Sequence, residues 1–240
     1  MTELLYQTDS YLREFEAVVT SVDVAARTVT LNRTAFYPGG GGQPCDTGDL
    51  EVGGRRYAVV RVERGNLHVL DGDTMPEAGA AAIGCLDWER RFKLMRTHTA
   101  MHILCGVVWR DYGASVTGGN MELLEGRMDF EFERLQKDFV QEIEDKINVE
   151  VRAARDVRVR ILPRGEAFQI PDLIRTKINL LPEGILEVRT VEIVGLDLQA
   201  DGGTHVNNTR AVGRIRITDY KSKGGINKRI YVRIEDDDQP

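Results

Sequence analysis

The pattern of hydrophobic and polar positions changes near residue 88 of the chain. Before that point, short runs of strand-forming residues alternate with turn residues such as Asp23–Ala26 and Gly53-Gly54. The runs that predict strands are Phe15–Val22, Arg27–Leu31, Tyr57–Val62, Leu67–Leu70 and Ala81–Leu86. Several short strands at this spacing are typical of a small β-barrel or sandwich, so we expect residues 1–87 to form an all-β domain.

After residue 88, hydrophobic residues recur at helical spacing. Asp87 is a candidate N-cap, and the apolar positions from Phe92 onward predict a helix that ends by Gly113. A second helix is predicted from about Leu135 to Asn148, because its apolar side chains share one face. Strands are expected at Arg127–Phe132, Val151–Ile161, Ile185–Val194, Val212–Thr218 and Arg229–Ile234. Residues 88–240 therefore predict an α+β domain in which helices pack on an antiparallel sheet.

The composition indicates a globular protein of the cytoplasm. The chain has 240 residues, of which 42% are hydrophobic and 29% are charged. The longest apolar run falls short of the roughly 18 residues that a membrane span needs, so we expect no membrane partner. Cys45, Cys85 and Cys105 are odd in number and lack C-x-x-C spacing, which argues against a disulfide framework.

The net charge of −6 is unevenly distributed. Residues 1–90 carry 8 Lys and Arg against 14 Asp and Glu, so residues 91–240 are neutral. Within that neutral part, basic residues gather in one stretch opposed by Asp219, namely Arg210, Arg214, Arg216, Lys221, Lys223, Lys228, Arg229 and Arg233. Such a stretch is either a solvated sheet face or a surface that binds phosphates.

Three of the four histidines predict a metal site. His98 and His102 are four residues apart on the first predicted helix, so their side chains share a face, and neutral imidazole is a common zinc ligand. His205 follows a pair of glycines, which let backbone approach a site closely. Asp201 could be a direct ligand or a partner of one. Three imidazoles around one ion would leave a position open for water activation or for polarising a carbonyl.

Neighbouring residues narrow the chemistry of this site. Cys105 lies on the same helical stripe but about 10 Å from His98 along the axis, so we expect it in the core. Thr99 stands where a His-Glu-x-x-His metalloprotease has its catalytic glutamate, which argues against peptidase chemistry. The segment Tyr37–Gln43 contains four consecutive glycines but no Lys-Ser/Thr pair, so it does not predict a Walker-type nucleotide loop or a nucleotide cofactor.

These motifs resemble the AlaX family, free-standing proteins similar to the editing domain of alanyl-tRNA synthetase. Arg96-x-His98-x-x-x-His102 and Gly202-Gly-Thr-His205 match its two zinc motifs, and residues 221–232 resemble its closing segment. The first half resembles the N-terminal barrel of the medium-length class, whose glycine-rich motif corresponds to Gly39–Gln43. The family pattern has Cys where this chain has Asp201, and exchanging soft sulfur for hard oxygen should weaken the preference for zinc.

The resemblance implies hydrolysis, in trans, of the ester bond in mischarged tRNA(Ala), chiefly the seryl form and secondarily the glycyl form. It implies one Zn²⁺ per chain, held by His98, His102 and His205 with Asp201 as fourth candidate. The cation would either activate the attacking water or hold the amino group of the substrate. Alternatives are a non-catalytic zinc-dependent tRNA-binding module and a metallohydrolase of small aminoacyl esters or amides.

The remaining site residues divide into catalytic and binding candidates. Thr99 and Thr204 flank the ligands and could orient water or the seryl hydroxyl, or could serve only helix and turn hydrogen bonding. The Gln43 amide could line the pocket, and the glycine segment could otherwise be a tight turn. The residues expected to contact the acceptor end of tRNA(Ala) are Gly39, Gly40, Gly41, Gly42, Arg96, Lys221, Lys223, Lys228 and Arg229.

Overall fold

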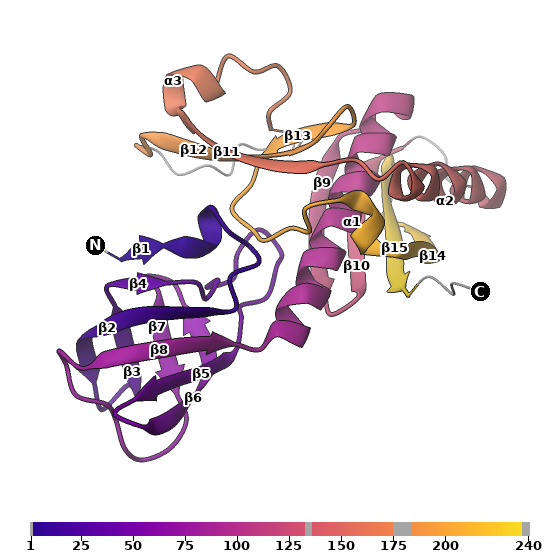
Figure 1. The fold of residues 1–240 in the computed structure, drawn as a ribbon. Coiled ribbons are helices and arrows are strands. Elements are labelled where there is room, and N and C mark those ends of the chain that lie inside the picture. Colours follow the sequence, from indigo (N-terminus) through magenta and orange to yellow (C-terminus); the bar gives the residue numbers. More distant parts are fainter. Residues whose placement is uncertain (1, 133–135, 175–183, 237–240) are drawn as a thin grey trace. The chain divides into compact units, whose positions relative to one another are not determined.

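The computed structural model of the protein describes residues 2–132, 136–174 and 184–236. It contains two compact units, Met1–Lys93 and Leu94–Pro240, and Figure 1 shows their elements. The first unit is a β-barrel, and the second combines helices with antiparallel sheets, which confirms the predicted fold class. We keep a domain boundary at residues 87/88 as a proposal, because strand β8 (Ala81–Leu86) ends there and helix α1 (Trp88–Tyr112) begins.

The barrel closes through six antiparallel strands. Their spatial order is β2 (Glu14–Asp23), β3 (Thr28–Leu31), β7 (Leu67–Leu70), β6 (Arg55–Glu63), β5 (Gly48–Val52) and β8. Hydrophobic and polar residues alternate along β2, which decides the face that it turns to the core. Phe15, Ala17 and Val19 are buried in the barrel core, and the residues between them are exposed. A short β1 (Glu3–Leu4) pairs in parallel with β4 (Arg33–Thr34), with a 3-10 turn, η1 (Leu5–Gln7), after β1.

The five predicted strands of this half correspond to β2, β3, β6, β7 and β8. The structure adds β5, which the sequence pattern missed because Gly48 and Asp49 are poor strand formers. The strand forms because both of its edges are paired, with β6 on one side and β8 on the other.

A buried ion pair fixes the base of the glycine segment. The Arg91 guanidinium donates to both carboxylate oxygens of Asp46 and to the carbonyls of Ser10 and Ala35, and the two paired side chains are 0% and 1% exposed. Asp46 also accepts from the backbone N–H of Tyr37 at 2.6 Å. The loop between Tyr37 and Asp46 is thereby tied to the first turns of α1.

In the second unit, α1 is the central element. Its residues from Leu94 to Val108 are all buried, as expected of a helix covered on several sides. One antiparallel sheet has the order β14 (Arg214–Ser222), β15 (Asn227–Glu235), β10 (Glu125–Glu131), β9 (Val116–Glu122). A second has the order β11 (Val157–Pro163), β12 (Glu187–Ile193), β13 (Asp197–Ala200). The other described elements are α2 (Lys137–Arg152), α3 (Arg164–Ala167) and η2 (Thr209–Val212).

The predicted strand Val151–Ile161 is wrong in its first part. Helix α2 continues to Arg152, and β11 begins only at Val157. Contacts with η2 hold the additional residues, because the Thr209 hydroxyl donates to the carbonyls of Glu150 and Val151 at 2.9 and 3.3 Å. The Asn148 amide donates to the carbonyl of Ile215 at 2.7 Å and accepts from its N–H at 3.0 Å, so it covers the free edge of β14. The predicted start of this helix, Leu135, lies outside the described residues.

Within residues 2–132, 136–174 and 184–236, no helix is both long enough and apolar enough to span a membrane.

Candidate metal centre

The structure brings the four predicted ligands together. His98 and His102 lie on α1, Asp201 and His205 lie in the loop after β13, and one donor atom of each is within 4.8 Å of the others. All four side chains are buried or nearly so, with Asp201 the most exposed at 13%. Side chains from two distant segments therefore converge on one small volume.

The spacing of the donor atoms suits one ion. Asp201 Oδ1 lies 3.4 Å from His98 Nε2, and Asp201 Oδ2 lies 3.0 Å from His205 Nε2. Donors bound tetrahedrally at the usual zinc distances of about 2.0–2.2 Å are roughly 3.4 Å apart. Asp201 thus lies among the imidazoles rather than behind them, in the position expected of a direct ligand.

Local structure explains how the loop presents Asp201 and His205. The N–H of Gly203 donates to Asp201 Oδ2 at 2.7 Å, which closes a tight turn after the carboxylate. The Asp201 N–H donates to the Arg189 carbonyl at 3.1 Å, and the Arg189 guanidinium donates to the Asp201 carbonyl at 2.9 Å. The loop is therefore fastened to β12 at its first residue.

Two of the imidazoles have partners on the ring nitrogen turned away from the centre. His205 Nδ1 lies 3.2 Å from Thr99 Oγ1, which also accepts from the N–H of Val206. His102 Nδ1 lies 3.0 Å from Asp197 Oδ2. Such partners orient a ligating imidazole, and a carboxylate partner also holds the imidazole proton on the remote nitrogen.

Burial and charge act on the pKa of each imidazole. Burial lowers the pKa of His98 well below its ordinary value and that of His205 to about 4, so both rings are neutral near pH 7, as ligands must be. Burial also acts against charge on His102, but the hydrogen bond and charge of Asp197 outweigh it and raise the pKa of that ring. Burial raises the pKa of Asp201. The adjacent imidazoles lower it more strongly, to well below its ordinary value, so the carboxylate is charged.

The predicted catalytic residues are all buried. Thr99 and Thr204 are 0% exposed and belong to the second unit, in which the ligands lie. Gln43 is 3% exposed and belongs to the barrel unit. Their catalytic roles stay predictions, and the contact that the structure adds for Thr99 is the one to His205.

The glycine segment forms a tight turn. The backbone N–H groups of Gly40 and Gln43 each donate to the other residue's carbonyl, at 3.0 and 2.9 Å. Gly39, Gly40, Gly41 and Gly42 all have positive φ, between 57° and 138°, a conformation that side chains disfavour. The four glycines are thus required by the turn itself, and a contact with tRNA stays a prediction.

The predicted basic contacts differ in how freely they could meet a phosphate. Lys221 and Lys223 are exposed, with Lys221 paired to Asp219 at 3.0 Å. Arg229 binds both oxygens of Asp129, at 2.6 and 2.8 Å, and buried Lys228 donates to the carbonyl of Gly225. The Arg229 and Lys228 side chains therefore donate hydrogen bonds within the hairpin of β14 and β15 and to its neighbour β10.

Arg96 also donates its hydrogen bonds within the second unit. Its guanidinium donates to the carbonyls of Val212 and Glu235, at 2.8 and 3.1 Å, and to the Asp236 carboxylate at 2.7 Å. Its side chain is 9% exposed. These contacts fasten α1 to the end of β15.

Three residues beside the centre, Asp197, Gln199 and Arg189, were missed in the sequence. Asp197 and Gln199 precede Asp201 at alternate positions of β13 and its continuation, and this period of two could have placed them on the side of the ligands. Arg189, which contacts Asp201, gave no such signal, because a charged residue in a predicted strand resembles an ordinary surface position. Cys105 is a buried core residue, as predicted.

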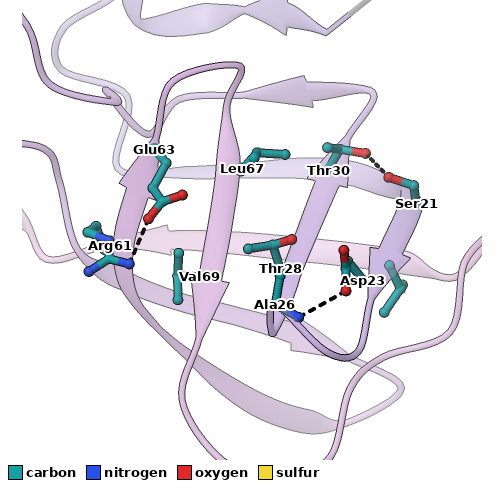
Figure 2. Close-up of a pocket in the computed structure, with 10 residues that line it drawn as sticks. Ser21, Asp23, Ala26, Thr28, Thr30, Arg61, Glu63, Leu67 and Val69 are labelled. Atoms are coloured by element: carbon teal, nitrogen blue, oxygen red, sulfur yellow. Dashed lines mark hydrogen bonds and ion pairs between the residues drawn. The ribbon is translucent and has the colours of Figure 1, made fainter.

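A separate groove lies on the outer face of the barrel, over β2, β3, β6 and β7 (Figure 2). It has a volume of about 470 Å³ and is open to solvent. Hydroxyl groups of Ser21, Thr28 and Thr30 line it, together with the Arg61–Glu63 ion pair of 2.6 Å. The groove contains no residue that the sequence predicted for the site.

Comparison with known sequences first defines the class of protein. Residues 188–231, which run from β12 through the loop with Asp201 and His205 into β15, match the family described as the second additional domain of threonyl and alanyl tRNA synthetases. This segment, which carries Asp201 and His205, is thus similar to a class of domains found in these two synthetases.

Longer matches give the family. The chain is 39% identical to the alanyl-tRNA editing protein AlaX-M of Saccharolobus solfataricus, over 98% of this chain and 100% of that protein. It is also 39% identical to AlaX-M of Methanosarcina acetivorans, with the same coverage of both chains. The alanine–tRNA ligase of Pyrobaculum neutrophilum is 37% identical over 90% of this chain, which spans 25% of that enzyme. The chain belongs to the AlaX-M family of alanyl-tRNA editing proteins, which confirms the predicted resemblance.

Proposed function

We propose that this protein hydrolyses the ester bond of mischarged tRNA(Ala), chiefly the seryl form and secondarily the glycyl form, acting in trans. Its relatives that match over the full length are alanyl-tRNA editing proteins, which makes the chain an aminoacyl-tRNA hydrolase at the level of the family. The observation that carries the proposal is the buried convergence of His98, His102, His205 and Asp201 in a chain of this family.

The four side chains fit a divalent cation, and we propose one Zn²⁺ per chain. Three imidazoles and one carboxylate are a donor set that zinc accepts, and the donor spacings of 3.0 and 3.4 Å agree with a shared ion. When bound, the cation supplies Lewis acidity beside the ester. Because Asp201 contributes oxygen rather than sulfur, the site should also accept harder divalent ions.

The protein's own contribution is positioning. An aminoacyl ester is already activated, so its hydrolysis needs an oriented water and a stabilised oxyanion more than a strong nucleophile. We assign Thr204 as the hydroxyl that orients water or the seryl side chain, since it directly precedes His205. For Thr99, the hydrogen bond to His205 supports the role of positioning that ring, and orientation of water or of the seryl hydroxyl stays a proposal. Gln43 stays a proposed polar contact to the acceptor end.

Discrimination between seryl and alanyl esters follows from hydrogen bonding. A site whose polar groups pair with a substrate hydroxyl rejects the analogue that lacks it, because those groups would then be buried without a partner. A correctly charged alanyl ester would thereby be spared. The glycyl ester lacks the hydroxyl as well, so this argument does not separate it from the alanyl ester, and its place as secondary substrate rests on the family resemblance.

For binding of the tRNA(Ala) acceptor end, the exposed Lys221 and Lys223 are the proposed phosphate contacts. We propose supporting roles for Lys228, Arg229 and Arg96, whose donors hold the surrounding backbone and side chains in place. We propose backbone contacts to the acceptor end for Gly39, Gly40, Gly41 and Gly42. The protein would act in the cytoplasm, where its substrate is made, and would need no nucleotide cofactor for this hydrolysis.

The test is deacylation of seryl-, glycyl- and alanyl-tRNA(Ala) side by side. We expect the seryl ester to be hydrolysed fastest and the alanyl ester slowest, and His98→Ala to lose more than about 100-fold in rate. Lys93→Ala is the matched control, because this partly exposed residue of the same helix pairs with Glu89 outside the cluster.

Three results would contradict the proposal. Equal rates on seryl and alanyl esters would remove the editing assignment. An undiminished rate in His98→Ala would contradict the proposed metal dependence. Stoichiometric binding of tRNA(Ala) without turnover would make the protein an RNA-binding module.

A further inference from the structure

We propose that Asp197 is a positioning residue of the metal centre, which holds the His102 ring with its proton on Nδ1 and its Nε2 toward the cation. This inference rests on the proposed metal-dependent function and deepens it by naming a residue outside the four ligands. Asp197 lies at the start of β13, and His102 lies on α1.

The contact is short and completely buried. Asp197 Oδ2 lies 3.0 Å from His102 Nδ1, and the Asp197 side chain is 0% exposed. The same oxygen accepts from the Gln199 amide at 2.7 Å, and that amide also lies 3.4 Å from His102 Nδ1 and from Cys105 Sγ. The carboxylate is therefore held in place by a neighbour on its own strand.

A glycine on α1 allows Asp197 to come this close to the helix. Gly106 is one helical turn after His102, and a Cβ built there would lie 2.9 Å from Leu196 Cγ and 3.0 Å from Asp197 Cβ. It would also lie 3.2 Å from the Leu196 carbonyl. Any larger residue at 106 would push the β12–β13 turn away from the helix, and Asp197 would move with it. This steric fit is independent of the hydrogen bond and leads to the same assignment.

The chemistry of imidazole explains what the contact does. A neutral ring carries one proton, and a carboxylate can only accept, so Asp197 draws that proton to Nδ1. The lone pair of Nε2 is then available to a cation. Ligating histidines commonly have such a carboxylate or carbonyl behind them, and losing it costs about 10–100-fold in metal affinity or activity.

The other histidine with an assigned outer partner provides an internal comparison. His205 has a neutral hydroxyl, Thr99 Oγ1, at 3.2 Å, whereas His102 has a charged carboxylate at 3.0 Å. A hydroxyl can donate as well as accept, so it does not by itself select a tautomer. Asp197 is not among the four clustered donors, His98, His102, Asp201 and His205, that could hold the ion in the described part of the chain. Its effect must therefore pass through His102.

The experiment compares the wild-type protein with Asp197→Ala, Asp197→Asn and the control Asp111→Asn. Asp111 is an aspartate near the end of α1 that pairs with Arg110 and Lys146, away from the histidine cluster. Zinc affinity is measured by competition with a chromophoric chelator. In the cation-free proteins, at a pH above the raised pKa of His102, ¹⁵N NMR reports which ring nitrogen carries the proton, and circular dichroism confirms folding.

We expect zinc affinity to fall about 10–100-fold in Asp197→Ala. The loss should be smaller in Asp197→Asn, because the asparagine oxygen can still accept from Nδ1. Asp111→Asn should bind zinc like the wild type. The His102 ring of folded Asp197→Ala should change from the Nδ1–H form to a mixture of tautomers. Unchanged affinity and an unchanged tautomer in Asp197→Ala would overturn the inference. If the wild-type protein binds no zinc, the proposed metal function fails, while the tautomer measurement still tests Asp197 separately.

Should Asp197→Ala fail to fold, Asp197→Asn and Gly106→Ala decide the matter. Gly106→Ala removes no polar group and acts only by displacing the turn that carries Asp197. We expect it to weaken zinc binding and to broaden the His102 tautomer population. Wild-type affinity in both folded variants would overturn the inference.

Discussion

The imidazole rings of His98 and His205 lie with their centroids 4.2 Å apart, although one belongs to helix α1 and the other to the loop after β13. Asp201 has an oxygen beside each ring. The centre therefore exists only when this unit is folded, because no single segment carries a complete donor set.

Cation binding should consequently stabilise the second unit. A ligand that binds the folded state alone adds about 2.7 kcal/mol when its free concentration is one hundred times Kd. We expect a chelator to lower the Tm of the wild-type protein in calorimetry and zinc to restore it. The His98→Ala variant should show neither change. Equal responses of the two proteins would place the cation elsewhere.

Replacing Asp201 with cysteine should change which ion the site prefers. Thiolate sulfur is a softer donor than carboxylate oxygen, so Asp201→Cys should bind zinc and cadmium more tightly relative to manganese. Direct competition between zinc and manganese, followed by metal analysis, measures this ratio in both proteins. A ratio that does not move would show that Asp201 is not a ligand, and Asp201→Asn, with a neutral donor, is the control for charge.

Removing one partner of the buried Arg91–Asp46 pair should strongly destabilise the barrel unit. Asp46→Ala leaves the Arg91 guanidinium uncompensated, and such a loss costs about 3–5 kcal/mol. The double variant Asp46→Asn with Arg91→Leu should lose less than the sum of the two single changes. Urea unfolding of the set measures these differences, and additive losses would argue against a coupled pair.

The barrel should lose stability in mild acid because of His68. This buried ring lies 2.9 Å from Thr34 Oγ1 and 3.3 Å from the Val29 carbonyl, and burial lowers its pKa from 6.5 to about 4. Above pH 6.5 the ring is neutral in both the folded and unfolded states, so it adds no pH dependence. As the pH falls from 6.5 toward 4, the unfolded state takes up the proton and stability drops by up to about 3 kcal/mol.

Urea unfolding at pH 7 and pH 4.5, for the wild type and His68→Gln, isolates this contribution. The variant should have a smaller difference between the two pH values. If both proteins lose the same stability on acidification, His68 is not responsible.

Affinity for tRNA(Ala) should depend on salt through the exposed lysines. Each phosphate contact adds about one to the slope of log K against log salt, so Lys221→Ala and Lys223→Ala should each flatten that slope. Lys137→Ala, an exposed lysine on α2, serves as the control. Filter binding across a salt series measures the slopes, and identical slopes in all variants would make the basic stretch an ordinary solvated face.

Much of this architecture could be predicted because the relevant signals are local. The i,i+4 spacing of His98 and His102 already places them on one face, and the short strands of the barrel follow from residue type and turn spacing. The parts that failed depend on contacts remote in sequence. Strand β5 and the last turn of α2 form because of their neighbours, namely strands β6 and β8 for β5 and the Thr209 hydroxyl, which donates to the carbonyls of Glu150 and Val151, for α2.

The surroundings of the ligands could be predicted only in part. The alternation of Asp197, Gln199 and Asp201 was a usable signal, whereas the role of Gly106 depends on how closely α1 approaches a distant turn. Similarly, the charge of Arg96 suggests a phosphate contact, but its carbonyl partners at Val212 and Glu235 become visible only in three dimensions.

The most direct test of the central claim is the hydrolysis rate of seryl-tRNA(Ala) when protein stripped of metal is titrated with zinc. The account predicts negligible turnover in the stripped protein and a linear recovery of activity that stops at one equivalent of zinc per chain. A stripped protein that hydrolyses the ester at the full rate, with no response to added zinc or other divalent ions, would contradict it.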